Sequence, residues 1–396
     1  MKNLKTIIGV GLALTLAVMM GCVEKFEADI SDMPIEGLVV EGNIISDSTV
    51  VFHLNWKLPL TYTEENEDWF DTYENVDAEL SVLGSDGTYW SGVPLGKGQF
   101  RVQIGELNPE VEYHLEIRCG GDTYLSAPQK PVGTLDIEGL RFSQPDLNGP
   151  VIISLDSKEG ETHDSRYYLW YFEEDWELRS EYVTDVLYNY DLDKVVRYDF
   201  PPVAQGWRYH GADQFVLGTT EANVINKIVG KELHTIKNTD RRLSVLYSIR
   251  VHQRTLTRKE YEYYQERAKL NKEMGGLFTP QPSELPTNIT CSDPSRKVIG
   301  YVGCNMGVAH YQLYIPEEEV FYLDTYQCKT GEEPAGSNQD KYMAGFQVWD
   351  VMGSDVFWSK NRCVDVRQMH ADPMGRPKWW PNPYLYYPET PDYVGF

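Results

Sequence analysis

Short segments of alternating polar and apolar residues fill the chain between residues 35 and 134. Residues 49–56 alternate clearly, and Ser85-Asp86-Gly87 separates two further segments as the turn of a hairpin does. Alternation with period two indicates strands that bury one face. Regular short strands with turns between them predict a β-sandwich of immunoglobulin-like or transthyretin-like type over residues 35–134.

A second β-rich domain is predicted over residues 135–396. Its clearest strand signals are the apolar run 151–155, the aromatic run 167–172 and the alternating run 243–253. Closely spaced prolines near the C-terminus exclude a regular helix or a central strand there. Residues 377–388 are therefore expected to form an irregular strap rich in aromatic residues.

One α-helix is inserted in this second domain. Thr257 is a suitable N-cap and Glu260 follows three residues later, which is the reciprocal capping-box pattern. The helix is expected to cover residues 258 to about 274. It should stop at Gly275-Gly276, because glycine readily adopts the left-handed conformation that ends helices.

The N-terminus has the organisation of an export signal. Two lysines precede an apolar run over residues 7–20, which is too short to span a bilayer of about 30 Å. The run ends at Gly21-Cys22 and resembles a bacterial lipobox, in which the cysteine becomes the lipid-bearing first residue of the mature protein. We expect residues 1–21 to be a lipoprotein signal peptide and Cys22 to be lipidated. Ordinary cleavage, with Cys22 as a free thiol, is the alternative.

The residues after Cys22 are acidic and lack a hydrophobic repeat, so residues 22–34 are expected to be a flexible tether. Acidic residues at this place resemble the surface-export signal of Bacteroidota lipoproteins. We therefore expect a protein anchored in the outer membrane by acyl chains such as palmitate, each buried CH₂ contributing about 0.8 kcal/mol. Exposure at the cell surface is the predicted orientation, and a periplasmic orientation is the alternative.

The charge balance narrows the range of partners. The 396 residues include 60 acidic and 36 basic side chains, and the formal net charge is −24. Sequence-independent binding to nucleic acid depends on Lys and Arg contacts with phosphates, so no nucleic-acid partner is expected. The hydrophobic fraction of 41% and the charged fraction of 24% are those of a globular chain.

Acidic side chains are densest between residues 61 and 77. Clustered carboxylates can ligate Ca²⁺, but this segment lacks the order of ligands found in an EF-hand loop. A solvated acidic loop is the favoured interpretation, because runs of like charge usually face water. The sequence therefore predicts no metal site.

Five cysteines lie beyond the lipobox, so at least one of them is unpaired. Exported bacterial proteins can form disulfides. The pairs closest in sequence are Cys291 with Cys304 and Cys328 with Cys363, which makes them the candidate disulfides, although spacing does not fix connectivity. Cys119 lies in an expected strand and is interpreted as a small buried apolar residue.

The sequence contains no recognisable catalytic constellation. It has no His-Glu-x-x-His zinc motif, no Gly-x-Ser-x-Gly nucleophile elbow, no P-loop and no glycine-rich dinucleotide fingerprint. The close pairs His163-Asp164 and His370-Ala371-Asp372 are explained by chance at least as well as by catalysis. We therefore expect a protein that is not an enzyme and that uses no cofactor.

Aromatic residues gather in the C-terminal strap, and Trp379, Trp380, Tyr384 and Tyr386 are the candidate contacts for a ligand or partner. Aromatic side chains can stack on sugars and are common in interface hot spots. The alternative is that their rings pack into a groove of the core. We favour packing, because a proline-rich segment needs it to stay ordered.

Four stretches of the chain carry a family resemblance. They are Cys22 followed by Leu38-Val39-Val40-Glu41-Gly42, the strand near Val251 with the helix containing Tyr261-Glu262-Tyr263-Tyr264, Pro286-Thr287-Asn288-Ile289 before Val298-Ile299-Gly300-Tyr301, and Cys363-Val364-Asp365 before Lys378-Trp379-Trp380. Together they resemble the Bacteroidota lipoproteins grouped as domain of unknown function 4249. That family often has a second cysteine just after its Cys-x-Asp, where this chain has Val366, so the pairing of Cys363 stays open.

The resemblance implies a modest function. Such lipoproteins look like cell-surface accessories that are often encoded beside TonB-dependent outer-membrane receptors. The expected function is a non-catalytic, lipid-anchored accessory or binding protein that partners a TonB-dependent transporter. The alternative is a surface glycan-binding protein that uses exposed aromatic residues.

Overall fold

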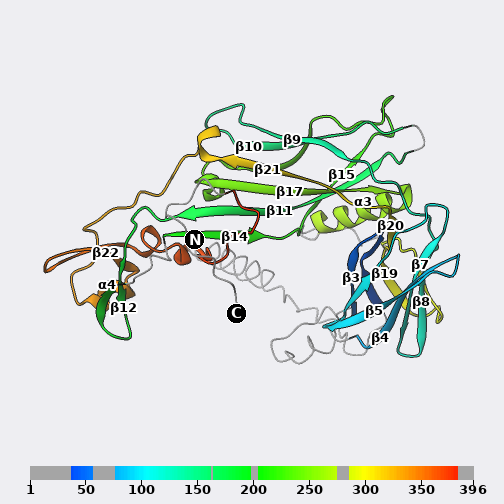
Figure 1. The fold of residues 1–396 in the computed structure, drawn as a ribbon, viewed down its shortest axis with the longest axis horizontal. Coiled ribbons are helices and arrows are strands. Elements are labelled where there is room, and N and C mark those ends of the chain that lie inside the picture. The colour runs from blue at the N-terminus through cyan, green and yellow to red at the C-terminus, as the bar shows by residue number, and fades with distance from the viewer. Residues whose placement is uncertain (1–36, 57–75, 162–163, 198–203, 274–284, 382–396) are drawn as a thin grey trace, which may run out of the picture.

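The computed structural model describes residues 37–56, 76–161, 164–197, 204–273 and 285–381. Strands far outnumber helices in these ranges, which confirms the prediction of a mainly β chain. Three parts follow one another along the longest axis in Figure 1: an N-terminal sandwich, a central sandwich and a smaller lobe. No helix in the described ranges is long and apolar enough to cross a membrane.

The N-terminal sandwich consists of a nine-stranded sheet folded into two layers and a separate two-stranded sheet. Its first strands are β1 (Gly37–Glu41), β2 (Asn43–Ile45), β3 (Thr49–Trp56), β4 (Ala78–Gly84), β5 (Tyr89–Gly96), β6 (Gln99–Gln103), β7 (Tyr113–Cys119) and β8 (Asp122–Ser126). The strand order in its nine-stranded sheet is β18-β8-β7-β4-β5-β6-β3-β1-β19. β5 joins the two layers, because its first residues pair with β4 and its later residues pair with β6.

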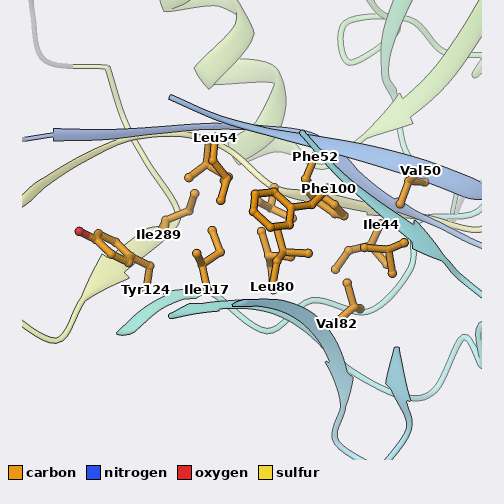
Figure 2. Close-up of a cluster of buried hydrophobic side chains, with 14 of the residues drawn as sticks. Ile44, Val50, Phe52, Leu54, Leu80, Val82, Phe100, Ile117, Tyr124 and Ile289 are labelled. Atoms are coloured by element: carbon orange, nitrogen blue, oxygen red, sulfur yellow. The ribbon is translucent and has the colours of Figure 1, made fainter. Parts of the chain in front are cut away.

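The core of this sandwich follows from the period-two pattern of the sequence. In β3, Val50, Phe52 and Leu54 are buried, and the residues between them are more exposed. Figure 2 shows these side chains meeting those of the opposite layer, among them Leu80 and Ile117. The alternation therefore decides which face of each strand is apolar.

Three strands from later in the chain complete the N-terminal sandwich: β18 (Ile289–Cys291), β19 (Lys297–Gly300) and β20 (Gly303–Asn305). β19 pairs in parallel with β1, β20 pairs in parallel with β2, and β18 pairs with β8. The predicted second domain over residues 135–396 therefore needs correction, because the chain returns to the first unit. Alternation identifies a strand but does not identify its partner strand.

The central sandwich packs two further sheets against each other. Its strands are β9 (Ile137–Ser143), β10 (Val151–Ser157), β11 (Tyr167–Arg179), β14 (Gln205–His210), β15 (Phe215–Thr219), β16 (Lys231–Ile236), β17 (Leu246–Leu256) and β21 (Ala309–Pro316). One sheet has the order β16-β10-β9, and the other has the order β14-β11-β17-β21 with β15 also paired to β11. Buried side chains from both sheets form one core, including Ile153, Trp170 and Ile249.

The smaller lobe lies at the far end of the molecule in Figure 1. It contains β12 (Val186–Asn189), β13 (Lys194–Arg197), α4 (Asn338–Met343), β22 (Phe346–Met352), β23 (Asp355–Lys360) and the 3₁₀ turn η4 (Asn361–Cys363). Three further 3₁₀ turns, η2 (Arg241–Leu243), η3 (Glu317–Glu319) and η5 (Val366–Met369), lie next to strands of the central sandwich. Trp358 and Tyr188 are in the main apolar cluster of the lobe.

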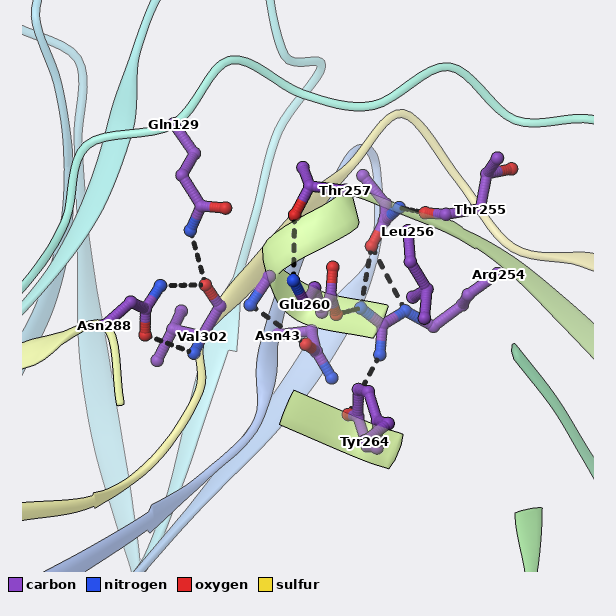
Figure 3. A network of polar contacts seen from close by, with 12 residues as sticks. Asn43, Gln129, Arg254, Thr255, Leu256, Thr257, Glu260, Tyr264, Asn288 and Val302 are labelled. Atoms are coloured by element: carbon purple, nitrogen blue, oxygen red, sulfur yellow. Dashed lines mark hydrogen bonds and ion pairs between the residues drawn. The ribbon is translucent and has the colours of Figure 1, made fainter. Parts of the chain in front are cut away.

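Helix α3 (Arg258–Glu273) begins where it was predicted to begin. The backbone N–H of Glu260 donates to Thr257 Oγ1 at 3.2 Å, but the Glu260 carboxylate does not close the expected capping box. It forms a buried ion pair with Arg254 (Figure 3). The Nε of Arg254 also donates to Asn305 Oδ1 at 3.1 Å. The buried guanidinium group of Arg254 needs the Glu260 carboxylate more than the N-cap residue Thr257 needs it. This network joins β17, α3 and β20, and so connects the two sandwiches.

Candidate functional site

A polar hollow of about 460 Å³ opens beside β11 in the central sandwich. It lies where β14, β16, η2 and η5 come together around that strand. We call it the Glu174 pocket, and its charged and aromatic lining consists of Phe172, Glu174, Trp176, Arg208, His210, Asp213, His234, Asp240, Arg241 and Arg242. This combination of cationic, acidic and aromatic groups in a concave site is typical of ligand binding.

The pattern of β11 explains why these groups meet. Alternate side chains of a strand share a face, so Glu174 and Trp176 point to the side of the strand that faces the pocket. The antiparallel register with β14 sets His210 beside Glu174 and Arg208 beside Trp176. The neighbouring pairs in this register therefore build one wall of the pocket.

Glu174 is the centre of the pocket, and only 2% of its surface is exposed. Its Oε1 accepts hydrogen bonds from Arg242 Nη1 at 2.6 Å and from the Tyr247 hydroxyl at 2.6 Å. His234 Nε2 lies 3.2 Å from the same oxygen, and His210 Nδ1 lies 3.3 Å from Oε2. Burial alone would raise the pKa of this carboxyl, but the hydrogen bonds and the charge of Arg242 outweigh burial and lower it to about 2.

Arg242 links Glu174 to a second acid. Its Nη2 donates to Asp240 Oδ2 at 2.9 Å, and Asp240 also caps η2 by accepting from the backbone N–H of Arg242. Burial opposes ionisation of Asp240, yet the hydrogen bonds from Arg242 lower its pKa below the usual value. The guanidinium of Arg242 is therefore neutralised on two sides and held in place.

The other two arginines of the pocket lack such partners. Arg208 Cζ lies 5.3 Å from the centre of the Trp176 ring, and none of the ion pairs among the described residues involves Arg208. Arg241 Nη1 contacts the sulfur of Met369 at 2.7 Å, and its buried Nε has no hydrogen-bond partner in the described part of the chain. Thioether sulfur is a weak acceptor, so both guanidinium groups retain capacity to bind an anion.

The chemistry of this arrangement favours binding. A carboxylate with a pKa of about 2 is a poor proton donor and a weak base at neutral pH. Burial and the neighbouring Glu174 raise the pKa of Tyr247 well above its ordinary value, so its phenol keeps its proton. The described ranges contain no group of side chains that could hold a metal ion.

The described part of the C-terminal strap, residues 377–381, does not line the Glu174 pocket. Trp380 is 5% exposed, packs with Trp207 and Leu246, and donates from Nε1 to Glu177 Oε2 at 3.2 Å. Trp379 is half-buried, with its ring 5.0 Å from the guanidinium carbon of Arg250. The interpretation of Trp380 as a ligand contact is therefore wrong, because the core covers its ring.

Several predicted residues lie outside the described ranges: Cys22 with the signal peptide, the tether over residues 22–34, most of the acidic segment over residues 61–77, the glycines 275–276, Tyr384 and Tyr386.

The cysteines separate into one bonded pair and free thiols. Cys328 and Cys363 form a disulfide with a Cα–Cα distance of 5.8 Å. Cys291 and Cys304 are both free, so that candidate pairing needs correction. Cys291 lies on β18, which pairs with β8, whereas Cys304 lies on β20, which pairs with β2. Cys119 is a buried free thiol in the core of the N-terminal sandwich.

No motif in the sequence singled out the residues of the Glu174 pocket. Glu174 and Arg242 are 68 residues apart, and their contact depends on how β11 and η2 pack. One signal was available: Glu173-Glu174-Asp175 interrupts the aromatic residues of β11. Charged residues in a buried strand need hydrogen-bonding or charged partners, so this triplet indicates that hydrogen-bond donors lie close to β11.

Comparison with known proteins gives a family and distant similarities of structure. The profile of the family described as "Domain of unknown function (DUF4249)" matches residues 23–306. No curated protein matches the chain. Among solved structures, a two-domain fibronectin type III segment of chicken tenascin is 11% identical, with a TM-score of 0.15, covering 54% of this chain and 88% of that chain. A DUF4785 family protein from Legionella pneumophila is 9% identical, with a TM-score of 0.17, covering 54% and 51%.

Proposed function

The chain belongs to the DUF4249 family, and from this premise we propose that it is a lipid-anchored outer-membrane lipoprotein that binds a small ligand in the Glu174 pocket. The observation that carries the proposal is the constellation around Glu174, in which four side chains hold one ionised carboxylate in a hollow of about 460 Å³. Groups fixed in advance lose little entropy when a ligand binds, which favours a binding role.

The role of accessory to a TonB-dependent transporter follows from the expected lipid anchor and the family resemblance. A protein tethered at a membrane can hold its ligand close to a receptor, and this raises the effective concentration of the ligand there. No catalytic role is proposed, because Glu174 is held ionised by its hydrogen bonds and is poorly suited to proton transfer.

Co-purification from native outer membrane tests the partnership. The tagged full-length protein should bring a TonB-dependent receptor with it after mild solubilisation. A Cys22→Ala variant serves as the control, because it keeps the folded body but loses the expected anchor. Recovery of the lipoprotein alone, under conditions that keep other receptor complexes intact, would count against the partnership.

The lipid anchor is tested separately by metabolic labelling with an alkyne analogue of palmitate. Wild-type protein should carry the label and fractionate with the outer membrane, whereas Cys22→Ala should lose the label. Protease added to intact cells should then digest the body of the wild-type protein if it faces outward. An unlabelled wild-type protein would contradict lipidation at Cys22.

A surface glycan-binding protein is the second candidate, and one observation on the N-terminal sandwich favours it. Tyr89 is 59% exposed and lines, with Trp90 and Arg101, a shallow hollow of about 480 Å³. Exposed tyrosine beside polar groups is suited to stacking on a sugar ring. A glycan array should then show binding that Tyr89→Ala removes and Trp380→Phe leaves unchanged. Identical array profiles for wild type and Tyr89→Ala would reject this candidate.

A further inference from the structure

Three arginines and three acids line the Glu174 pocket, but two of the acids share a single arginine. Of its three arginines, Arg242 alone forms ion pairs with carboxylates among the described residues, to Glu174 and Asp240. Arg208 stacks near Trp176, and Arg241 contacts a thioether sulfur. The pocket thus holds two guanidinium groups without a counter-ion, in a chain whose formal net charge is −24.

The unpaired state of Arg241 is the sharper of these two observations. Its Nε is buried and has no acceptor in the described part of the chain. A buried donor without a partner is destabilising, and more so when the group is charged. Because water cannot reach this Nε, an anion in the pocket would bind the terminal nitrogens of Arg241, since planar guanidinium groups match carboxylate and phosphate oxygens in pairs.

The pocket also has apolar lining. Phe172, Leu178 and Met369 contribute it. The two histidines have other roles, because His234 and His210 both lie against Glu174, and His210 Nε2 also lies 3.4 Å from Asp213. A ligand in this pocket would therefore meet both cationic donors and apolar side chains.

We infer that the Glu174 pocket binds a small organic molecule through an oxyanion group, with Arg208 and Arg241 as the groups that contact the oxyanion. This inference rests on the proposed function, because it specifies the ligand of the same pocket. Glu174 has a positioning role: it holds Arg242, His234 and His210 in place and leaves Arg208 and Arg241 to the ligand. Carboxylate and phosphate share this chemistry, and the experiment distinguishes them.

Isothermal titration calorimetry on the full-length lipoprotein in detergent tests the inference. The probes are D-glucuronate, inorganic phosphate and, as the neutral counterpart, D-glucose. Glucuronate or phosphate should bind at least tenfold more tightly than glucose, because a charge-assisted hydrogen bond contributes enough for about a tenfold change or more. Tighter binding of glucuronate identifies an organic carboxylate, and tighter binding of phosphate identifies a phosphate group.

Matched variants locate the site. Arg208→Gln and Arg241→Gln should each weaken binding of the preferred anion about tenfold. Arg208→Lys should recover part of the loss, since it restores charge without the planar fork. Arg118→Gln is the control, because Arg118 is an exposed arginine on β7 of the N-terminal sandwich, and it should bind as wild type does. If Arg241→Gln impairs folding, Arg208→Gln still tests the inference, because Arg208 is exposed and its substitution should leave the fold intact.

Three outcomes would overturn the inference: affinity for both anions no higher than for glucose, wild-type affinity in both arginine variants, or no binding of either anion. Each of these outcomes can be distinguished from a failure of the proposed accessory function. If a receptor co-purifies and no anion binds, the accessory role stands and the ligand assignment falls. If anions bind at Arg208 and no receptor is recovered, the ligand assignment stands and the partnership falls.

Discussion

Glu174 and Asp175 are neighbours on β11, yet their pKa values shift in opposite directions because the two side chains face different sides of the strand. Glu174 points into the pocket and has a pKa of about 2. Asp175 is almost as deeply buried, with 8% of its surface exposed, and its pKa is raised to about 6. Both residues carry a carboxyl group, so the difference comes from their surroundings.

The surroundings differ in hydrogen-bond donors. Donors from three other elements and from Tyr247 on β17 surround the Glu174 carboxylate. In the described part of the chain, no donor reaches the Asp175 carboxylate, and burial raises its pKa although the charge of Arg250 acts in the opposite direction. Burial therefore penalises both acids, and directed donors reverse the effect for Glu174 alone.

The side of β11 that faces the pocket differs physically from the side that is only buried, because a carboxylate that organises other groups must stay ionised. Glu174 meets this condition at any pH above about 2. Asp175 gains a proton near pH 6 and has no fixed partner to orient. Four substitutions test this contrast.

The largest effect is expected from Glu174→Gln. This change leaves Arg242 without one of its two carboxylates and removes the charge that His234 and Tyr247 contact. Breaking a buried ion pair by removing one partner lowers stability by about 3–5 kcal/mol. Urea unfolding at pH 7 measures the change. A loss below about 1 kcal/mol would show that the network around Glu174 does not stabilise the fold.

Asp175→Asn is the matched change on the opposite face, and we expect it to stabilise the protein. The folded state binds the Asp175 proton more tightly than the unfolded chain, whose pKa is near 3.8, so stability is lost as pH rises from about 4 to about 6. Two pKa units correspond to about 3 kcal/mol, which is the upper limit of the gain at pH 7. Unfolding curves at pH 3.5 and 7 should show the gain only at pH 7. An equal gain at both values would contradict the burial of an ionised Asp175.

Tyr247→Phe removes a single donor from Glu174 and keeps the ring in the core. The hydroxyl donates to Glu174 Oε1 at 2.6 Å, and a hydrogen bond to a charged group contributes about 2 kcal/mol. Urea unfolding should therefore show a loss of about 2 kcal/mol. Tyr314→Phe on β21 is the control, because no hydrogen bond of its hydroxyl is found in the described structure. Equal losses of stability in the two variants would mean that the hydrogen bond from Tyr247 to Glu174 does not contribute to the stability of the fold.

The smallest effect on stability is expected from Arg208→Gln. Arg208 is exposed and has no ion pair among the described residues, so its removal should change the free energy of unfolding by less than about 0.5 kcal/mol. The same variant is expected to lose anion affinity, which distinguishes a ligand-binding residue from a structural one. Thermal unfolding with and without glucuronate measures both properties. A destabilised Arg208→Gln protein would give Arg208 a structural role like that of Arg242.

Much of the fold could be predicted from local pattern. The alternation in residues 49–56 gave β3 and its buried face, and Thr257 gave the start of α3. The candidate site could not be predicted in this way, because Glu174, His234 and Arg242 come from separate elements. Glu260 shows what spacing alone does not determine. It lies at the correct distance from Thr257 for a capping box, but its carboxylate forms an ion pair with Arg254 instead.

The sequence by itself determined which segments are strands and which of their faces are apolar, because side-chain alternation is a property of neighbouring residues. Only the tertiary structure decided that residues 289–305 return to the N-terminal sandwich and that the ring of Trp380 is buried. It also decided which of two adjacent acids on β11 would meet donors. Sheet register and packing bring distant residues within hydrogen-bond distance, and no local pattern encodes those distances.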